Sequence, residues 1–186
     1  MPAIVDHDER RSSYARAAWA VIGDHGLVGT TMRDLASAAG VTTGALTHYF
    51  ESKQQLVERA LEQLASDTLE RTSQVAVSDT DDLADLILLA LPATADTQTE
   101  WKTWIALWSE CARGNAAALS LNERFDARWL EVLASALTTL GHAEPEAAAH
   151  RLAMTINGVG IDACLSPAKW PTETLAEFAT DLARRG

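Results

Sequence analysis

The chain has little cysteine, no long apolar segment and no excess of basic residues, and each shortage excludes a class of protein. Its two cysteines, Cys111 and Cys164, supply neither a disulfide framework nor a paired metal motif. The apolar stretch over residues 86–91 is far shorter than the roughly 18 apolar residues of a membrane-spanning helix. The first residues, MPAIVDHDERR, lack the basic-then-apolar order of an export signal. We therefore expect a cytoplasmic protein with reduced thiols.

Basic residues are scarce overall, with 15 Lys and Arg against 26 Asp and Glu and a formal net charge of −11. Averaged over the chain, this charge argues against nucleic-acid binding, because phosphate contacts are largely electrostatic. The charge is unevenly distributed, however. Residues 10–53 carry five basic and three acidic residues, whereas residues 60–186 carry nine basic and nineteen acidic residues. Only the first region is suited to approach phosphate.

Strand patterns are also missing, because no run of β-branched residues alternates with polar ones. With 186 residues, 47% of them hydrophobic, the chain is long enough to bury a core in one or two globular domains. Apolar periodicity and capping residues predict an all-α fold with helices over residues 12–24, 31–39, 43–50, 52–74, 81–91, 98–113, 116–140, 145–165 and 172–185.

Residues 31–50, TMRDLASAAGVTTGALTHYF, predict two short helices joined at a Gly-Val step. Thr31 and Asp34 form a capping-box pattern at the first helix, and Thr42 or Thr43 opens the second. In a helix-turn-helix this arrangement lets the second helix protrude into a major groove while the first braces it. Generic helix pairs with a glycine between them share the pattern.

A longer segment is more specific. GLVGTTMRDLASAAGVTTGALTHYFESKQQLVERAL, over residues 26–61, closely resembles the DNA-binding domain of TetR-family transcriptional regulators in its Thr-Thr opening, AAGV turn, HYF ending and SK-x-x-L helix start. The segments EWKTWIALWSECARGN and TINGVGIDACL are similar to the ligand domain of the betaine-repressor (BetI-like) branch. The resemblance implies a tail over residues 1–9, a helix-turn-helix DNA-binding domain over 10–51, a connecting helix over 52–76, and a ligand-binding and dimerisation domain over 77–186.

Polar side chains on the predicted helix pair are the candidate DNA contacts. Hydroxyls at helix ends and one ammonium suit phosphate oxygens, which orient a protein on DNA without reading its sequence; these residues are Thr31, Thr43, Tyr49 and Lys53. Base contacts would come from the exposed face of the second helix, namely Thr42, Gly44, Ala45, Thr47 and His48.

Arg33 is the strongest candidate for a guanine contact, because the family often places a base-contacting residue at this position. Many family members carry Tyr where this chain has Thr47, so the base-contact pattern of the family does not transfer as a whole. Two alternatives stay open: Tyr49 as a core ring with a solvated hydroxyl, and His48 as an ordinary surface residue.

Three tryptophans, Trp101, Trp104 and Trp108, recur at i, i+3 and i+7, so one helix face carries three indoles. Such a face either fills a core or lines a ligand cavity. Together with Trp129 and with Asp126 one turn before it, the indoles would form a cage for an organic cation, at about 0.5 to 2 kcal/mol for each contact. Resemblance to the choline-responsive branch implies the same ligand charge. Packed core is the alternative.

Enzyme and metal motifs are missing. The chain has no Gly-rich phosphate loop, nucleophile elbow or paired carboxylate motif, so we expect neither an enzyme nor a cofactor. His142, Glu146 and His150 stand at i, i+4 and i+8, but Pro145 is predicted to begin its helix after His142. We therefore expect no metal site there.

The two last helices, over residues 145–165 and 172–185, are those through which the family dimerises. The first of them is rich in alanine and glycine, which allow close helix approach across a self-complementary face. The sequence thus predicts a homodimeric repressor that binds double-stranded DNA at an inverted-repeat operator and is released by a small-molecule effector. A helix-turn-helix protein without an effector is the alternative, followed by a helical enzyme.

Overall fold

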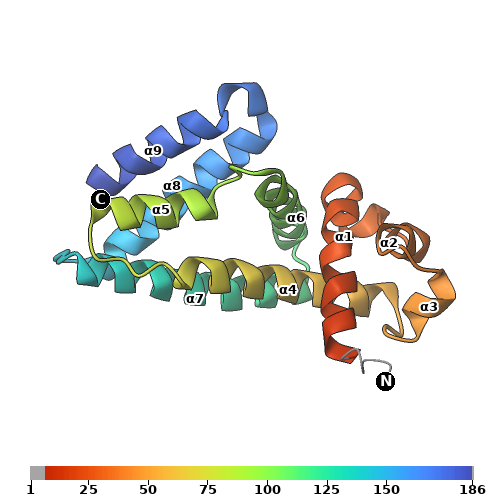
Figure 1. The fold of residues 1–186 in the computed structure, drawn as a ribbon. Coiled ribbons are helices and arrows are strands. Elements are labelled where there is room, and N and C mark those ends of the chain that lie inside the picture. Colours follow the sequence, from red (N-terminus) through yellow and green to blue (C-terminus); the bar gives the residue numbers. More distant parts are fainter. Residues whose placement is uncertain (1–6, 186) are drawn as a thin grey trace, which may run out of the picture. The chain divides into compact units, whose positions relative to one another are not determined.

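The computed structural model describes residues 7–185 and consists of helices within that range, with no strand (Figure 1). The elements are α1 (His7–Gly29), α2 (Met32–Ala38), α3 (Thr43–Thr47), α4 (Lys53–Ser73), α5 (Thr80–Ala90), α6 (Ala95–Ala112), α7 (Ala116–Thr139), α8 (Pro145–Leu165), the 3-10 turn η1 (Pro167–Lys169) and α9 (Thr172–Arg185). The predicted all-α fold is confirmed. Among these described helices, none has both the length and the apolar character needed to cross a membrane.

The first helix differs most from its prediction. It begins at His7, so residues 7–9, which the sequence assigned to the tail, form its first turn; residues 1–6 lie outside the described range. Near its other end, Gly26 has a φ of 69°, which glycine adopts without the steric cost of a side chain. The helical geometry is interrupted there, at the predicted end, although the helix resumes to Gly29.

The contacts divide the chain into two compact units, and each unit is discontinuous in sequence. The first contains the chain up to Ser66 together with Lys102–Leu121, and the second contains Asp67–Trp101 and the chain from Asn122 onward. Residues 102–121, which lie within the predicted domain over residues 77–186, thus group with the first unit. The reason lies in α6, where the Thr103 hydroxyl donates to the carbonyl of Trp19 on α1 at 2.9 Å.

In the first unit, α1, α2 and α3 pack around the start of α4 (Figure 1). The Trp19 indole N–H donates to the Ala60 carbonyl at 2.9 Å and fastens α1 to α4. Apolar side chains close this small core, and those with no more than 1% exposure include Ile22, Leu35, Leu46, Phe50 and Leu56. A short helix such as α3 is stable only because it packs on such a core.

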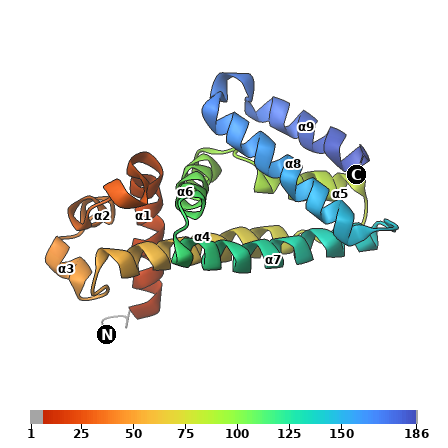
Figure 2. The ribbon, with the colours of Figure 1, turned by 180° about the vertical axis from the view of Figure 1, so that it is seen from behind.

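In the second unit, α5, α8 and α9 lie side by side in two opposite views (Figures 1 and 2). The Asp79 carboxylate caps α5, and Asp82 completes a capping box. Trp101 packs against α8 so closely that a Cβ added at Gly160 would lie 2.1 Å from the indole Cη2. Fully buried leucines and one isoleucine fill the remainder, among them Leu83, Leu86, Ile87, Leu91 and Leu133.

Candidate nucleic-acid interface and buried polar network

Reciprocal hydrogen bonds between Thr31 and Asp34 hold the start of α2. The Thr31 hydroxyl and amide donate to Asp34 Oδ2 at 2.6 and 3.2 Å, and the Asp34 amide donates to Thr31 Oγ1 at 3.3 Å. The hydrogen bond from the Thr31 side chain is the main cause that lowers the pKa of Asp34. The predicted capping box is confirmed, and it sets the direction of α2.

The next helix, α3, presents a polar and small-residue face. Thr42 caps it by accepting from the Ala45 amide at 3.1 Å. Leu46 is fully buried on the inner side, as is Phe50 just after the helix. The outward residues Thr43, Gly44, Thr47 and His48 are exposed, whereas Ala45 is half-buried. Because its side chains there are small, this face permits close approach of another molecule.

The remaining predicted DNA contacts differ in their exposure and in the hydrogen bonds that they form within the protein. Arg33 is exposed on α2. Tyr49 is half-buried, and its carbonyl accepts a hydrogen bond from Arg11 Nη1 at 2.7 Å. The Lys53 ammonium donates to the carbonyls of Leu27 and Val28 at 3.2 and 3.3 Å, so it ties α4 to the end of α1. Lys53 thus has a structural role that the sequence did not predict.

The structure adds residues of α1 to this surface. The His7 ring stacks on Tyr49 with centroids 4.7 Å apart, and Tyr14 meets the same ring edge-on at 5.2 Å. A hydrogen bond with Tyr14, followed by electrostatic attraction to Tyr49, raises the pKa of Arg10, which is fully exposed. His7 and Arg10 lie before the predicted helix start at residue 12, so the sequence did not place them here; the earlier start brings Arg10 and Tyr14 to i and i+4 on one face.

The predicted cage residues fall in both units. Trp104 and Trp108, in the first, stack with ring centroids 6.2 Å apart, and Trp104 is buried while Trp108 is half-buried. Trp101 and Trp129, in the second, are 6% and 4% exposed. Asp126 is exposed on α7. Three of the four indoles are therefore packed side chains in this structure.

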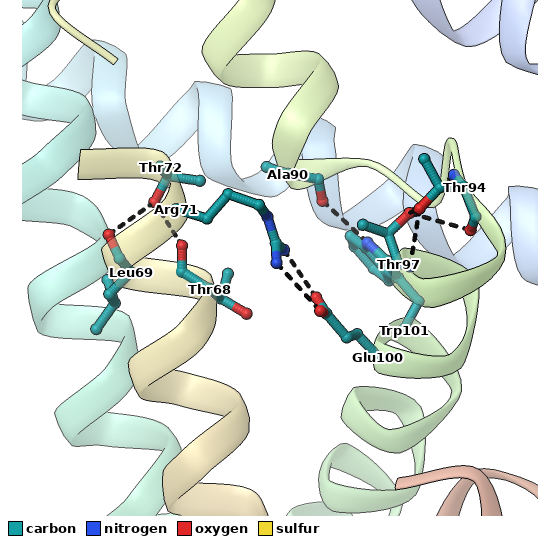
Figure 3. A network of polar contacts seen from close by, with 9 residues as sticks. All are labelled: Thr68, Leu69, Arg71, Thr72, Ala90, Thr94, Thr97, Glu100 and Trp101. Carbon is teal, nitrogen blue, oxygen red and sulfur yellow. Dashed lines mark hydrogen bonds and ion pairs between the residues drawn. The ribbon is translucent and has the colours of Figure 1, made fainter. Parts of the chain in front are cut away.

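A buried polar network in the second unit was not predicted (Figure 3). Arg71 on α4 donates from Nη1 to Oε1 of Glu100 at 3.1 Å and from Nη2 to Oε2 at 2.7 Å. Next to this pair, the Trp101 indole N–H donates to the Ala90 carbonyl at 2.9 Å, and the Thr72 hydroxyl donates to the Thr68 carbonyl at 2.8 Å. The buried carboxylate of Glu100 is thus paired, as a charged group withdrawn from water must be.

Comparison with known proteins identifies both parts of the chain. The model of bacterial regulatory proteins of the tetR family matches residues 15–60, and the model of the C-terminal part of BetI-type transcriptional repressors matches residues 79–185. The chain belongs to the TetR family. As a TetR-family member it is a transcriptional regulator and not an enzyme, and the match over residues 15–60 contains the candidate interface on α2 and α3.

Curated TetR-family relatives match nearly the whole chain. The regulator PksA of Bacillus subtilis (strain 168) is 26% identical over 91% of this chain and 85% of its own length. The regulator BetI of Burkholderia mallei (strain NCTC 10229) is 29% identical over 97% of this chain and 95% of its own length. Both are named HTH-type transcriptional regulators, in agreement with the helix-turn-helix seen in α2 and α3.

Solved structures show the same fold. A transcriptional regulator from Rhodococcus sp. Rha1 superposes with a TM-score of 0.82 at 26% identity and covers 94% of each chain. A regulator from Saccharomonospora viridis, solved in complex with choline, superposes with a TM-score of 0.80 at 22% identity and covers 95% of this chain and 96% of that chain. The all-α fold of the described residues is therefore that of TetR-family regulators.

Proposed function

We propose that this chain is a homodimeric repressor that acts in the cytoplasm, binds an inverted-repeat operator and is released by a small molecule. The observation that supports this function best is the face of α3, where exposed polar and small residues lie over a fully buried Leu46 and Phe50. The surrounding region is also the part of the chain with a basic excess, which suits DNA.

In this proposal α3 enters the major groove. The residues on its outward side, with Arg33 from α2, contact base edges, and guanine is the base that suits a bidentate guanidinium. The proposed base-contacting residues are Arg33, Thr42, Gly44, Ala45, Thr47 and His48. The phosphate contacts come from Thr31, Thr43, Tyr49 and Lys53, and Arg10 joins them because its charge is exposed beside Tyr49. The Tyr49 carbonyl and the Lys53 ammonium already take part in hydrogen bonds within the protein. Tyr49 would therefore contact phosphate through its hydroxyl, and Lys53 through the charge of its ammonium group.

The dimer forms through α8 and α9 in this proposal. Met154 and Leu165 of α8 are 72% and 74% exposed, and Gly158 lies between them on the same face of the helix. Two large exposed apolar side chains beside a glycine favour a close helix contact with a second copy. The two α3 helices would then be separated by about 34 Å, one turn of DNA.

The effector is an organic cation in this proposal. The BetI-type match and the choline complex of the Saccharomonospora viridis regulator support this ligand class. The chain itself offers indole side chains, including the half-buried Trp108, and buried carboxylates. An effector that weakens DNA binding must itself bind the operator-bound protein more weakly than the free protein, and by the same factor. The corresponding coupling free energy is typically about 1 to 3 kcal/mol.

Selection of operators from random double-stranded DNA by the purified protein tests the function. We expect an inverted repeat, and Arg33→Ala is expected to lose preference at one base pair of each half-site by about 1 to 3 kcal/mol. Arg128→Ala, which removes the same charge from an exposed position on α7 outside the proposed dimer and DNA interfaces, is the matched control. Selected sequences without two-fold symmetry, or no selection at low salt, would contradict the proposal.

Sedimentation tests the dimer separately. Met154→Glu is expected to convert a micromolar dimer to monomer, because it places a charge on the apolar face of α8. Val28→Glu is the control, since Val28 is equally exposed, at 74%, but lies on α1. A wild-type monomer would refute the proposed assembly.

A DNA-binding regulator without an effector is the second candidate. The burial of Trp101, Trp104 and Trp129 favours it, because filled positions leave no room for a ligand. Titration of choline against the selected operator complex distinguishes the two functions. Release of DNA supports the effector-controlled repressor, and unchanged binding with a panel of organic cations supports the second candidate.

A further inference from the structure

The Arg71–Glu100 pair is asymmetric in its burial. The side chain of Glu100 is 8% exposed, whereas that of Arg71 is 28% exposed. Arg71 is also the longer and more flexible of the two, and it lies on the last turn of α4. If the pair opens, Arg71 is therefore the partner that reaches water, and Glu100 is the partner that stays buried.

The network also contains polar atoms that no described residue satisfies. Arg71 Nε and Thr68 Oγ1 are both buried and have no hydrogen-bond partner. Thr68 is 8% exposed and stands one helical turn before Arg71 on α4, so its side chain lies beside the pair (Figure 3). Buried polar atoms without partners are rare in proteins, and an unbound ligand is one reason for them.

Charge balance determines which ligand this network accepts. A buried carboxylate without a partner is strongly unfavourable. A cation that takes the place of the guanidinium keeps Glu100 paired, whereas an anion would add a second negative charge beside it. Because Arg71 is the more exposed partner, its guanidinium can move to water and leave its place to the incoming cation.

We propose that Glu100 is the effector carboxylate: a small organic cation displaces Arg71 from it, and Thr68 Oγ1 hydrogen-bonds an oxygen of the same ligand. This inference rests on the proposed function and specifies the chemistry of its effector. The ligand class is an alkylammonium compound that carries a hydroxyl or carbonyl group a few bonds from the nitrogen.

The exchange also explains how binding would alter DNA affinity. Arg71 attaches the end of α4 to α6 through the ion pair, and α4 is the helix whose first residue, Lys53, is tied to α1 in the first unit. Release of Arg71 removes a charged tether from α4. The end of α4 that lies in the second unit is then no longer held by an ion pair, and α4 is the helix that continues into the first unit.

Calorimetric titration of the full-length protein tests the inference with two matched probes. Choline carries the cation and the hydroxyl, and 3,3-dimethylbutan-1-ol has the same shape with carbon in place of nitrogen. We expect choline to bind and its neutral analogue to bind at least about tenfold more weakly. Glu100→Gln is expected to reduce choline affinity about ten- to hundredfold while the affinity for the neutral analogue is unchanged.

Arg71→Met is expected to change the choline affinity in the opposite direction from Glu100→Gln. Without the competing guanidinium, choline is expected to bind more tightly than it does to the wild type and to raise the melting temperature of the variant by more. A merely structural pair would instead weaken choline binding when either partner is removed. The melting temperature without ligand verifies that each variant is folded, and Thr68→Val is expected to weaken choline but not tetramethylammonium.

Failure of this inference is distinct from failure of the proposed function. Operator binding by Glu100→Gln without ligand tests the function, and its choline affinity tests the site. Equal choline affinity in wild type and Glu100→Gln, or weaker binding in Arg71→Met, would overturn the inference and leave the repressor intact. Binding of choline and its neutral analogue with equal affinity would overturn it as well.

Discussion

The start of the helix-turn-helix and the Arg71–Glu100 network hold their polar groups in opposite environments. Thr31 and Asp34 are three residues apart, and their hydrogen bonds lie at an exposed helix start. Arg71 and Glu100 are 29 residues apart, and Glu100 is nearly withdrawn from water. On the surface, water stabilises each polar group independently, whereas a buried charge depends on its partner.

This difference separates recognition from stability. A substitution on the exposed face of α3 changes what the protein contacts but leaves the core of the first unit unchanged. A substitution in the network removes the partner of a buried charge, so it is expected to change stability as well as any ligand binding at Glu100. Surface positions are therefore suited to test DNA recognition, and the network requires variants of similar side-chain size together with a measurement of folding.

The largest expected effect is the loss of the buried pair. Arg71→Met is expected to lower the free energy of unfolding by about 3 kcal/mol, because Glu100 remains buried without a partner. The double variant Arg71→Met with Glu100→Met is expected to recover most of this loss. Urea denaturation measures both.

The control for the buried pair is an exposed one in the first unit. Lys102 Nζ lies 3.4 Å from Asp24 Oδ1, and the two side chains are 55% and 61% exposed. Asp24→Asn is expected to change the free energy of unfolding by less than about 0.5 kcal/mol. Similar losses for the exposed and buried pairs would show that burial does not distinguish them.

Close packing in the second unit gives the next largest effect. Gly160→Ala is expected to cost about 1 to 3 kcal/mol, because the new methyl group would overlap the six-membered ring of Trp101. In a Trp101→Phe background the same substitution is expected to cost less, since the smaller ring leaves space. Thermal denaturation of the wild type, the two single variants and the double variant gives the coupling free energy between the two positions. Stability losses that simply add would contradict the contact.

A cap in the first unit has a smaller effect. Thr31→Ala removes the hydroxyl that accepts from the Asp34 amide and donates to its carboxylate, and it is expected to lower the free energy of unfolding by about 1 kcal/mol. Thr43→Ala, at an exposed residue that does not cap α3, is the control and is expected to change stability by no more than about 0.5 kcal/mol. Chemical denaturation at neutral pH distinguishes them.

The smallest expected effect is the pH dependence of stability that comes from Asp162 on α8, which contacts two residues after that helix. Hydrogen bonds to Asp162, first from Lys169 at 2.8 Å and then from Trp170 at 2.7 Å, lower the pKa of its carboxyl group. Because the folded-state pKa lies below the unfolded value of about 3.9, the ionised group stabilises the fold above that pH. This contribution is lost as the pH falls through the folded-state pKa.

Comparison with Asp162→Asn measures that loss. The difference in stability between wild type and variant is expected to be present at pH 6 and to shrink below about pH 4. Trp170 fluorescence reports the same contact locally, since its indole N–H is one of the donors. A difference that stays constant down to strongly acidic pH would contradict the assignment.

Local signals in the sequence predicted much of this protein. The capping box at Thr31, the helix start at Thr42 and the glycine after Ala39 depend on residues only a few positions apart, and they predicted α2 and the start of α3; α3 ends at Thr47, three residues before its predicted end. The longer helices followed from apolar periodicity. The start of α1 was missed because its acidic first turn resembles a solvated tail, although acidic residues also stabilise a helix start.

The sequence by itself determined the all-α fold, the helix-turn-helix and the polar character of its outer face, because each arises from neighbouring residues and from the period of a helix. Only the tertiary structure decided that Lys102–Leu121 joins the first unit, that Trp101 packs on Gly160, and that Arg71 pairs with Glu100. These contacts join residues far apart in the chain. Burial and charge pairing determine such contacts, and no pattern of neighbouring residues shows which distant residue will be the partner.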